Sequence, residues 1–374
     1  MLKPNFRISI WFLLGVAALV AVPAYSHWVF ARPGPLAREA SVLIKKGTTI
    51  SQATEILFDK GIIDSKRLFL LRAKIGGPKI IRGEYIFPAK SSMASVWNKL
   101  TKGMIHTTKL VITPALHGWL VQKRLEPFIP ENKFWSMWEN PELIRQTGFP
   151  DAPSLEGLIA PATYSLNLAM EPEEIILEMV QSFRTQVFPL LVGGVLPPYQ
   201  TLILASLAEK ETNLAEELPK ITGVFNNRLK SRMKLQCDPT SLYARWLSGD
   251  LRFTPPTRED IARSHPYNTY STMGLPPSPI AIPSRAAIEA AKAPSETQYF
   301  YFVATGSGGH NFSQTLKEHN QFVNAYRNEV NRQRRASQTT APRLQANTRT
   351  SAGRPSARPT PRRATSPTRK SQVD

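Results

Sequence analysis

Cysteine is almost absent from this chain of 374 residues, in which Cys237 is the single thiol. One thiol excludes an internal disulfide framework and any zinc site built from several cysteines. The six histidines include no i, i+4 pair on an expected helix, and no zinc-protease string occurs. There is also no glycine-rich phosphate loop and no Gly-x-Ser-x-Gly elbow. The sequence therefore gives no support to zinc-protease, nucleotide-binding or serine-hydrolase chemistry, and we expect neither a metal nor a cofactor.

Acidic residues are scarce, and the formal net charge is +19. The segment from Arg332 to Asp374 carries 11 Lys or Arg and one acid, about half of that excess. This segment is rich in Arg, Pro, Ser and Thr and has almost no large apolar side chain. Such a composition cannot bury a core, so residues 333–374 are predicted to be a disordered basic tail. A nucleic-acid-binding protein is the class that the charge first suggests, but no recognition fold accompanies it.

Charged residues are missing from residues 8–30, which are mostly apolar and follow Lys3 and Arg7. A helix of this length crosses roughly 30 Å of hydrocarbon. The sequence thus predicts a short cytoplasmic N-terminus (residues 1–7) and a transmembrane anchor (residues 8–30), with Trp28 as an interfacial residue. The alternative is a cleaved signal peptide, because Val22-Pro23-Ala24 resembles a cleavage site.

Two folded parts of mixed α and β structure are expected after a short Pro/Gly linker. Residues 39–112 are predicted to form a small module, and hydrophobic periodicity places in it the strands Ser41–Ile44, Gly83–Phe87 and Thr107–Ile112 and the helices Thr49–Lys60, Ser65–Ile75 and Ser92–Thr101. Residues 113–332 are predicted to form a larger α+β domain with helices Trp119–Pro127, Tyr199–Thr212, Glu217–Ser231, Ser284–Ala293 and Ser313–Glu329 and a strand Tyr299–Ala304.

The most unusual chemical feature is Glu209-Lys210-Glu211-Thr212 at the end of a strongly apolar helix. At 3.6 residues per turn, Glu211 continues the apolar stripe of Leu204, Leu207 and Ala208. A partly desolvated carboxyl has a raised pKa, which suits a general acid, whereas a solvated helix end is the alternative. Glu209 and Glu211 are about 200° apart around the helix, so they cannot flank one glycosidic bond. A glycan-cleaving enzyme of this kind would use one acid.

Longer strings carry a specific resemblance, and they occur in chain order: EGLIAPATY (156–164), LASLAEKET (204–212), FNNRL (225–229), KLQCDPTSLY (234–243), HPYNTYSTMGLPPSPIAIPS (265–284) and YFYFVATGSGGHNFSQTLKEHN (299–320). Together they resemble the endolytic murein transglycosylases, the MltG/YceG-like family, over roughly Val42 to Val330. The resemblance implies a LysM-like small module followed by a YceG-like catalytic domain.

The resemblance also implies a reaction. Glu211 would protonate the β-1,4 oxygen between N-acetylmuramic acid and N-acetylglucosamine and then activate the C6 hydroxyl. Ring closure would leave a 1,6-anhydromuramic end, without water or metal. The family cuts nascent glycan strands beside the membrane, which implies a single-pass inner-membrane protein with a periplasmic catalytic domain. Expected partners are peptidoglycan strands, the inner membrane and peptidoglycan synthases, and no specific nucleic acid.

Other matched residues have polar or aromatic side chains suited to sugars. The proposed substrate-binding set is Glu209, Asn227, Arg228, Gln236, Asp238, Tyr164, Asn268 and Tyr270. A structural Arg228–Asp238 ion pair is an equal alternative, and His310 is expected in the core rather than in a cleft. Ala162 stands where the family usually has aspartate, and Cys237 where it has Thr or Ser. A non-catalytic wall-binding scaffold is the competing function.

Overall fold

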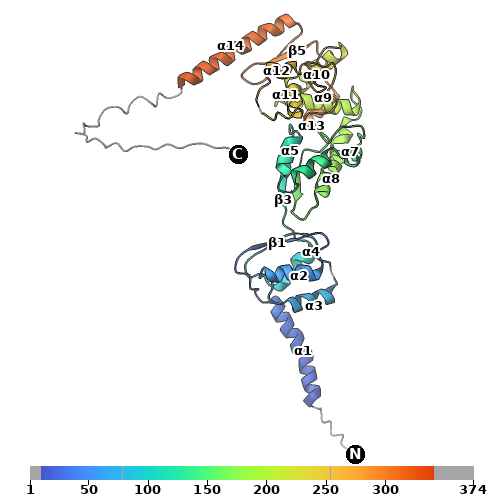
Figure 1. The fold of residues 1–374 in the computed structure, drawn as a ribbon, viewed down its shortest axis with the longest axis vertical. Coiled ribbons are helices and arrows are strands. Elements are labelled where there is room, and N and C mark those ends of the chain that lie inside the picture. Colours follow the sequence, from blue (N-terminus) through green and yellow to red (C-terminus); the bar gives the residue numbers. More distant parts are fainter. Residues whose placement is uncertain (1–9, 78, 253, 341–374) are drawn as a thin grey trace, which may run out of the picture.

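A computed structural model describes residues 10–77, 79–252 and 254–340. The chain is elongated, and a long helix leads into a small module that is followed by a larger domain (Figure 1). Each of the two folded parts has its own cluster of buried apolar side chains. The fold is therefore a mixed α+β structure in two parts, as the hydrophobic periodicity predicts.

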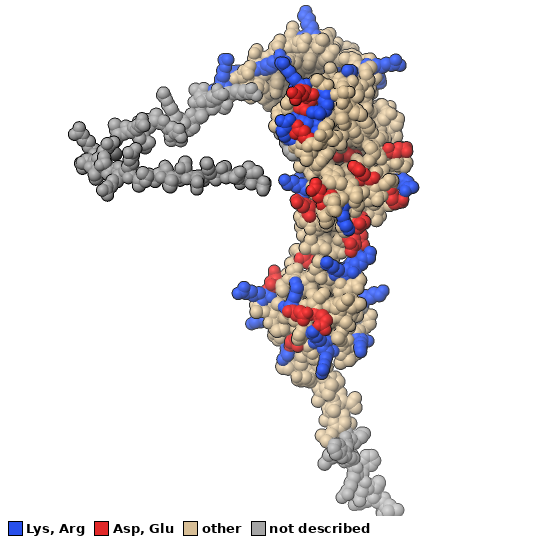
Figure 2. All heavy atoms as spheres, in the orientation of Figure 1, with Lys and Arg blue, Asp and Glu red and all other residues tan. Residues whose placement is uncertain are grey.

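The N-terminal helix α1 (Ile10–Ala31) matches the predicted apolar span, although residues 8 and 9 lie outside the described ones. The window Leu14–Ala31 is long and apolar enough to cross a membrane, and almost none of it is buried. No charged side chain is visible along it (Figure 2). A signal sequence has the same properties, so the helix by itself does not decide between anchor and leader.

The small module consists of β1 (Ala40–Ile44), α2 (Ile50–Asp59), α3 (Lys66–Gly76), β2 (Gly83–Phe87) and α4 (Met93–Lys102). The strands pair antiparallel. Local signals explain the helix ends: Thr49, Ser65 and Ser92 accept backbone N–H bonds as N-caps. Gly77 and Gly103 end α3 and α4 in the left-handed conformation. The predicted elements of this module are therefore confirmed to within about one residue.

The larger domain begins earlier than the sequence predicts. The strand β3 (Thr108–Ile112) pairs antiparallel with β4 (Ala162–Leu166), which periodicity alone did not reveal. It therefore belongs to the larger domain and not to the small module. An isolated bridge between Glu84 and His106 marks the junction.

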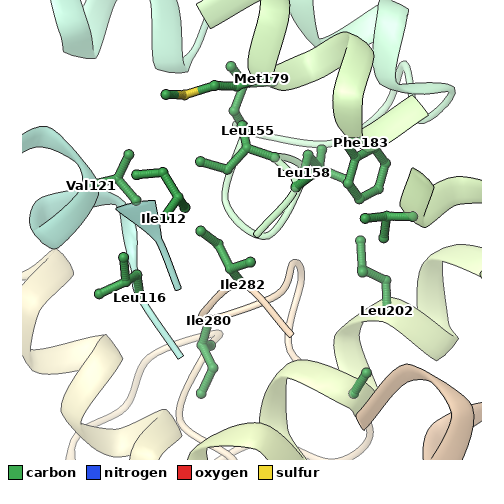
Figure 3. Close-up of a cluster of buried hydrophobic side chains, with 14 of the residues drawn as sticks. Ile112, Leu116, Val121, Leu155, Leu158, Met179, Phe183, Leu202, Ile280 and Ile282 are labelled. Atoms are coloured by element: carbon green, nitrogen blue, oxygen red, sulfur yellow. The ribbon is translucent and has the colours of Figure 1, made fainter. Parts of the chain in front are cut away.

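Helices make up most of the larger domain. In chain order they are α5 (Gly118–Leu125), α6 (Glu131–Trp138), α7 (Pro141–Thr147), α8 (Pro172–Ser182), η1 (Phe183–Val187), η2 (Phe188–Leu191), α9 (Pro198–Glu211), α10 (Leu218–Lys230), α11 (Asp238–Leu247), α12 (Arg258–Ala262) and α13 (Arg285–Lys292). Figure 3 shows the core where Ile112 and Leu116 meet Leu155, Leu158 and Ile282.

The helix α9 lies at the centre of this domain, packed against α10, α11 and α13. All eight residues from Thr201 to Ala208 are buried. Burial on every side means that the apolar stripe of the sequence is only part of a fully enclosed helix. Pro198 at the first turn starts the helix without losing a hydrogen bond.

The chain closes with a hairpin, β5 (Tyr301–Ala304) and β6 (His310–Ser313), and the helix α14 (Leu316–Thr340). The predicted tail boundary at residue 333 is wrong for the first eight residues, because α14 includes them. Gln333 donates to the Gly306 carbonyl and to Glu329, and Arg332 pairs with Glu329. These contacts stabilise the helix at the composition break. The rest of the predicted tail lies outside the described residues.

Candidate active site

The last residue of α9, Glu211, reaches a cavity in the larger domain. The cavity volume is about 470 Å³. It is lined by Glu211, Arg228, Leu235, Gln236, Asp238, Tyr270, Tyr301, Phe302, Val303, Ala304, His310, Leu316, His319, Val323 and Tyr326. These residues come from α9, α10, the loop between α10 and α11, α11, the loop before α13, the β5–β6 hairpin and α14. Sequence segments more than a hundred residues apart thus meet around one carboxyl group.

The surroundings of Glu211 favour the protonated form of its carboxyl group. Burial is the largest cause, and together with repulsion from Asp238 it raises the pKa of Glu211 to about 7. A hydrogen bond from the Cys237 thiol and the positive charge of Arg228 act in the opposite direction and lower it. A pKa near neutrality allows one group to donate a proton and then to recover one. The direction of this pKa change is the one that the sequence argument predicts for Glu211.

Arg228 is held in place by the backbone. Its Nε donates to the Phe300 carbonyl at 2.6 Å and its guanidinium also bonds the Leu235 carbonyl at 2.7 Å. The guanidinium lies 5.2 Å from the centre of the Tyr301 ring. Among the described residues it forms no ion pair with Asp238, so that structural alternative is wrong. Arg228 is instead a fixed positive charge beside Glu211.

Asp238 is a second carboxylate in the cavity. Its Oδ1 accepts a hydrogen bond from the Tyr270 hydroxyl at 2.6 Å, and burial raises the pKa of Tyr270. Gln236 lines the same wall, with a backbone φ of 49°. A non-glycine residue with positive φ is uncommon and strained, and such strain gathers at functional sites. Asp238, Tyr270 and Gln236 therefore lie together on the wall of the cavity that contains Glu211.

His310 lies on the cavity wall and is also satisfied by a partner. Its Nδ1 lies 2.7 Å from Glu217 Oε2, and its backbone N–H donates to Glu217 Oε1. Burial raises the pKa of Glu217, but the bonds from His310 outweigh it and the pKa is lowered overall. The expectation that His310 lies in the core and not in a cleft is thus wrong in part. The contact between His310 and Glu217 joins the β6 strand to the start of α10.

Four residues of the predicted substrate-binding set do not line the cavity. The Glu209 carboxylate accepts the Ser284 N–H at the start of α13. Asn227 donates to the Thr297 and Tyr299 carbonyls. Tyr164 is buried, and its hydroxyl donates a hydrogen bond to the Ala160 carbonyl.

Asn268 is fully buried. Its amide donates to three carbonyls around the end of α12, and its Oδ1 accepts the Tyr270 N–H. Glu209, Asn227, Tyr164 and Asn268 thus bond backbone groups and do not line the cavity, so the structure does not place them with the other members of the predicted substrate-binding set. Asn268 does act on the site indirectly, because it fixes the loop that presents Tyr270.

Sequence reasoning gave no role to Glu156, which lies in a matched string and is 1% exposed. Its Oε2 accepts the Gly118 N–H at 2.9 Å and the Tyr243 hydroxyl at 3.0 Å. Burial raises the pKa of Glu156 to about 7. It joins α5 to α11 and does not line the cavity. An acid inside an otherwise apolar string was the signal that could have identified it.

The two departures from the family pattern lie in different places. Ala162 is the first residue of β4 and does not line the cavity. Cys237 is buried, and its thiol donates a hydrogen bond to Glu211. In the described residues, no three His, Cys, Asp or Glu side chains gather closely enough to hold a metal ion.

A central helix that brings one protonatable carboxyl group to an aromatic-lined cavity defines an α+β protein with a site suited to acid–base chemistry. The YceG-like family model matches residues 42–325, and the chain belongs to this family. An endolytic murein transglycosylase of Bacillus subtilis is 29% identical over 310 residues, covering 76% of this chain and 84% of that protein.

Two further proteins extend the comparison. An endolytic murein transglycosylase of Streptococcus pneumoniae serotype 2 is 36% identical over 162 residues, which cover 41% of this chain and 29% of the pneumococcal protein. A crystal structure of a YceG-like protein from Listeria monocytogenes is 29% identical. It superposes with a TM-score of 0.51 and covers 76% of this chain and 99% of that one.

Proposed function

We propose that this protein is an endolytic lytic transglycosylase that cleaves the β-1,4 bond from N-acetylmuramic acid to N-acetylglucosamine in nascent peptidoglycan. The observation that carries the proposal is the Glu211 carboxyl group in the cavity, with its pKa raised to about 7. Membership of the YceG-like family and the names of its relatives supply the substrate class. Cleavage of nascent strands would terminate their elongation.

In the proposed mechanism, protonated Glu211 donates its proton to the bridging oxygen as the bond to the muramyl C1 breaks. The muramyl N-acetyl oxygen supports the positive charge at C1, so the protein needs no nucleophile of its own. The Glu211 carboxylate then takes the proton from the C6 hydroxyl, and O6 bonds to C1 to close the 1,6-anhydro ring. Glu211 is thereby regenerated in its protonated form, and no water is consumed.

The neighbours of Glu211 support this cycle. Asp238, held by Tyr270, places a negative charge in the cavity where the sugar cation would form. Arg228 favours the ionised form of Glu211 between the two proton transfers. Tyr270 on the cavity wall offers an aromatic side chain to the sugar rings. The substrate-binding set of this proposal is therefore Arg228, Gln236, Asp238 and Tyr270.

We further propose that α1 anchors the protein in the inner membrane, with the larger domain in the periplasm. Retention is supported by a described helix of 22 residues, longer than the apolar core of a signal peptide. The exposed rings of Tyr25 and Trp28 near its end fit a membrane interface. The small module is proposed to be LysM-like and to grip the glycan strand. Peptidoglycan synthases are the expected partners.

The test of the catalytic proposal is a pair of matched variants, Glu211→Gln and Glu209→Gln. Each replaces a carboxyl group at the same helix end by an amide of similar size, and glutamine at position 209 still accepts the Ser284 N–H. Purified variants are incubated with uncrosslinked glycan strands, the products are identified by mass spectrometry, and folding is checked by circular dichroism.

General acid–base catalysis contributes roughly a hundred- to ten-thousand-fold. We expect Glu211→Gln to lose activity at or beyond the upper end of that range and Glu209→Gln to keep most of it. Substantial activity in folded Glu211→Gln would refute the catalytic assignment. Products with reducing muramic ends would refute ring closure and indicate a hydrolase. Absence of turnover in the wild type would favour the wall-binding scaffold.

A further inference from the structure

The helix α3 of the small module exposes apolar side chains that the module does not need for its own core. Phe69 and Ala73 face inward and are buried. Leu71 and Ile75 are 50% and 72% exposed. Exposed apolar side chains that recur along one short helix are typical of a surface that contacts an apolar phase.

The charges of α3 have one sign. The segment KRLFLLRAKIG contains four basic residues and no acid. Lys66 pairs with Glu55 and Asp59 on α2. Within the described part of the chain, the other three form no ion pair, and they are Arg67, Arg72 and Lys74. An exposed surface with three free cations beside leucine and isoleucine matches the chemistry of anionic lipid headgroups over acyl chains.

Direct contacts fix α3 to the end of the apolar helix α1. The Phe30 ring stacks on Phe69 with 6.2 Å between ring centres, and Val29 is 5% exposed in the module core. Arg32, directly after α1, pairs with Asp64 just before α3 at 2.6 Å. Figure 1 shows α3 at the edge of the module from which α1 projects, running across the direction of α1.

The length of α1 sets the level of α3. A helix of 22 residues is about 33 Å long, close to the thickness of the hydrocarbon core. If Tyr25 and Trp28 mark the interface, Phe30 and α3 lie at the headgroup level. Lys and Arg side chains are visible at this end of the module (Figure 2).

Hollows flank α3 on both sides. One, of about 450 Å³, lies between α1, α3 and α4, and its lining includes Phe30, Leu68, Ile75 and Arg72. The other, of about 600 Å³, includes Leu70 with Arg67 and Lys74. Each hollow thus combines apolar walls with at least one cation. A phospholipid offers the complementary features, namely apolar acyl chains and an anionic phosphate.

We propose that α3 is a membrane-surface docking element that binds anionic phospholipid at the outer face of the membrane crossed by α1. Leu71 and Ile75 enter the acyl boundary, and Arg67, Arg72 and Lys74 contact lipid phosphates. Docking holds the small module flat against the bilayer and sets the height of the catalytic cavity above it. The inference rests on the anchor part of the proposed function and is independent of the catalytic part.

The test uses the full chain in lipid nanodiscs with a spin label at Ile75→Cys. The native Cys237 is buried, so the unsubstituted chain is the labelling blank. The control is Met104→Cys, a position 54% exposed that follows α4 and precedes β3 of the larger domain. Power saturation compares the accessibility of each label to oxygen, which enters lipid, and to a nickel chelate, which stays in water.

In discs containing phosphatidylglycerol, we expect the Ile75 label to favour oxygen and the Met104 label to favour the nickel chelate. Discs of phosphatidylcholine alone, or reversal of Arg67, Arg72 and Lys74 to Glu, should return the Ile75 label to water. Loss of each cation weakens attraction to an anionic surface about fivefold. Circular dichroism checks that the reversed variant is folded.

Three outcomes would overturn the inference. An Ile75 label that stays aqueous while the protein remains in the disc removes the docking surface but leaves the anchor intact. An Ile75 label shielded equally in both lipids and after charge reversal indicates a protein partner or a second copy. Protein that separates from the discs altogether shows that α1 is not an anchor, and the anchor proposal then fails together with the docking one.

Discussion

Replacing Glu211 with glutamine should stabilise the protein, and the gain should depend on pH. Burial raises the pKa of Glu211 from the ordinary value of 4.5 to about 7 in the folded state. A pKa shift of one unit corresponds to about 1.4 kcal/mol, so ionising this group in the folded protein costs at most about 3 kcal/mol more than in the unfolded chain. Glutamine has a similar shape and does not ionise. The variant therefore avoids this cost.

The sign follows from proton binding. Below pH 4.5, Glu211 is protonated in both the folded and the unfolded chain, so its ionisation costs nothing. Between pH 4.5 and 7 the unfolded chain releases the proton first, and the wild type loses stability as pH rises. Well above pH 7 Glu211 is ionised in both states, and the stability of the wild type falls no further on its account. We expect the stability advantage of Glu211→Gln to grow by up to about 3 kcal/mol between pH 4.5 and 8.

The assay is urea unfolding of both full-length proteins in detergent, followed by tryptophan fluorescence at several pH values. The free energy of unfolding is extrapolated to zero urea at each pH. Glu156, whose pKa is also raised to about 7, is present in both proteins and cancels from their difference. Curves that stay parallel from pH 4.5 to 8 would show that the Glu211 pKa is not raised, and the acid–base argument would lose its basis.

Three further substitutions probe the surroundings of Glu211. Cys237→Ala removes a thiol that lowers the Glu211 pKa, so the alkaline limb of the pH–rate profile should move to higher pH, whereas Cys237→Ser should restore it. Asn268→Ala should cost roughly 2–3 kcal/mol in urea unfolding, because three carbonyls around the end of α12 lose their buried donor, and an unchanged midpoint would contradict this role. Gln236→Gly should relieve the positive φ and raise stability by about 1 kcal/mol while turnover falls, and a stability loss would refute the strain.

Sequence alone was sufficient where neighbours along the chain decide the structure. The helices α2, α3 and α4 begin at Thr49, Ser65 and Ser92 because each cap bonds a backbone N–H within three residues. The apolar run of α9 was equally readable. Glu211 could be selected because it continues the apolar stripe of this helix, and because longer strings resembled a known family.

Tertiary structure decided where the side chains point. Glu211 and Glu209 are two residues apart, yet one lines the cavity and the other holds α13. Tyr164 and Asn268 looked suitable for binding sugar, but both side chains are buried and donate hydrogen bonds to backbone carbonyls. A polar side chain in a sequence can satisfy a substrate or the backbone, and local pattern does not distinguish the two.

The long-range pairings were also beyond local pattern. The strand β3 joined the larger domain because β4, about fifty residues later, supplies its hydrogen bonds. The cavity wall of β5 and α14 comes from residues about ninety to a hundred and fifteen positions after Glu211. The sequence determined which helix ends in an acid. Only the packed chain could determine that this acid is partly desolvated, because its pKa depends on burial and on Cys237, Asp238 and Arg228 from other elements.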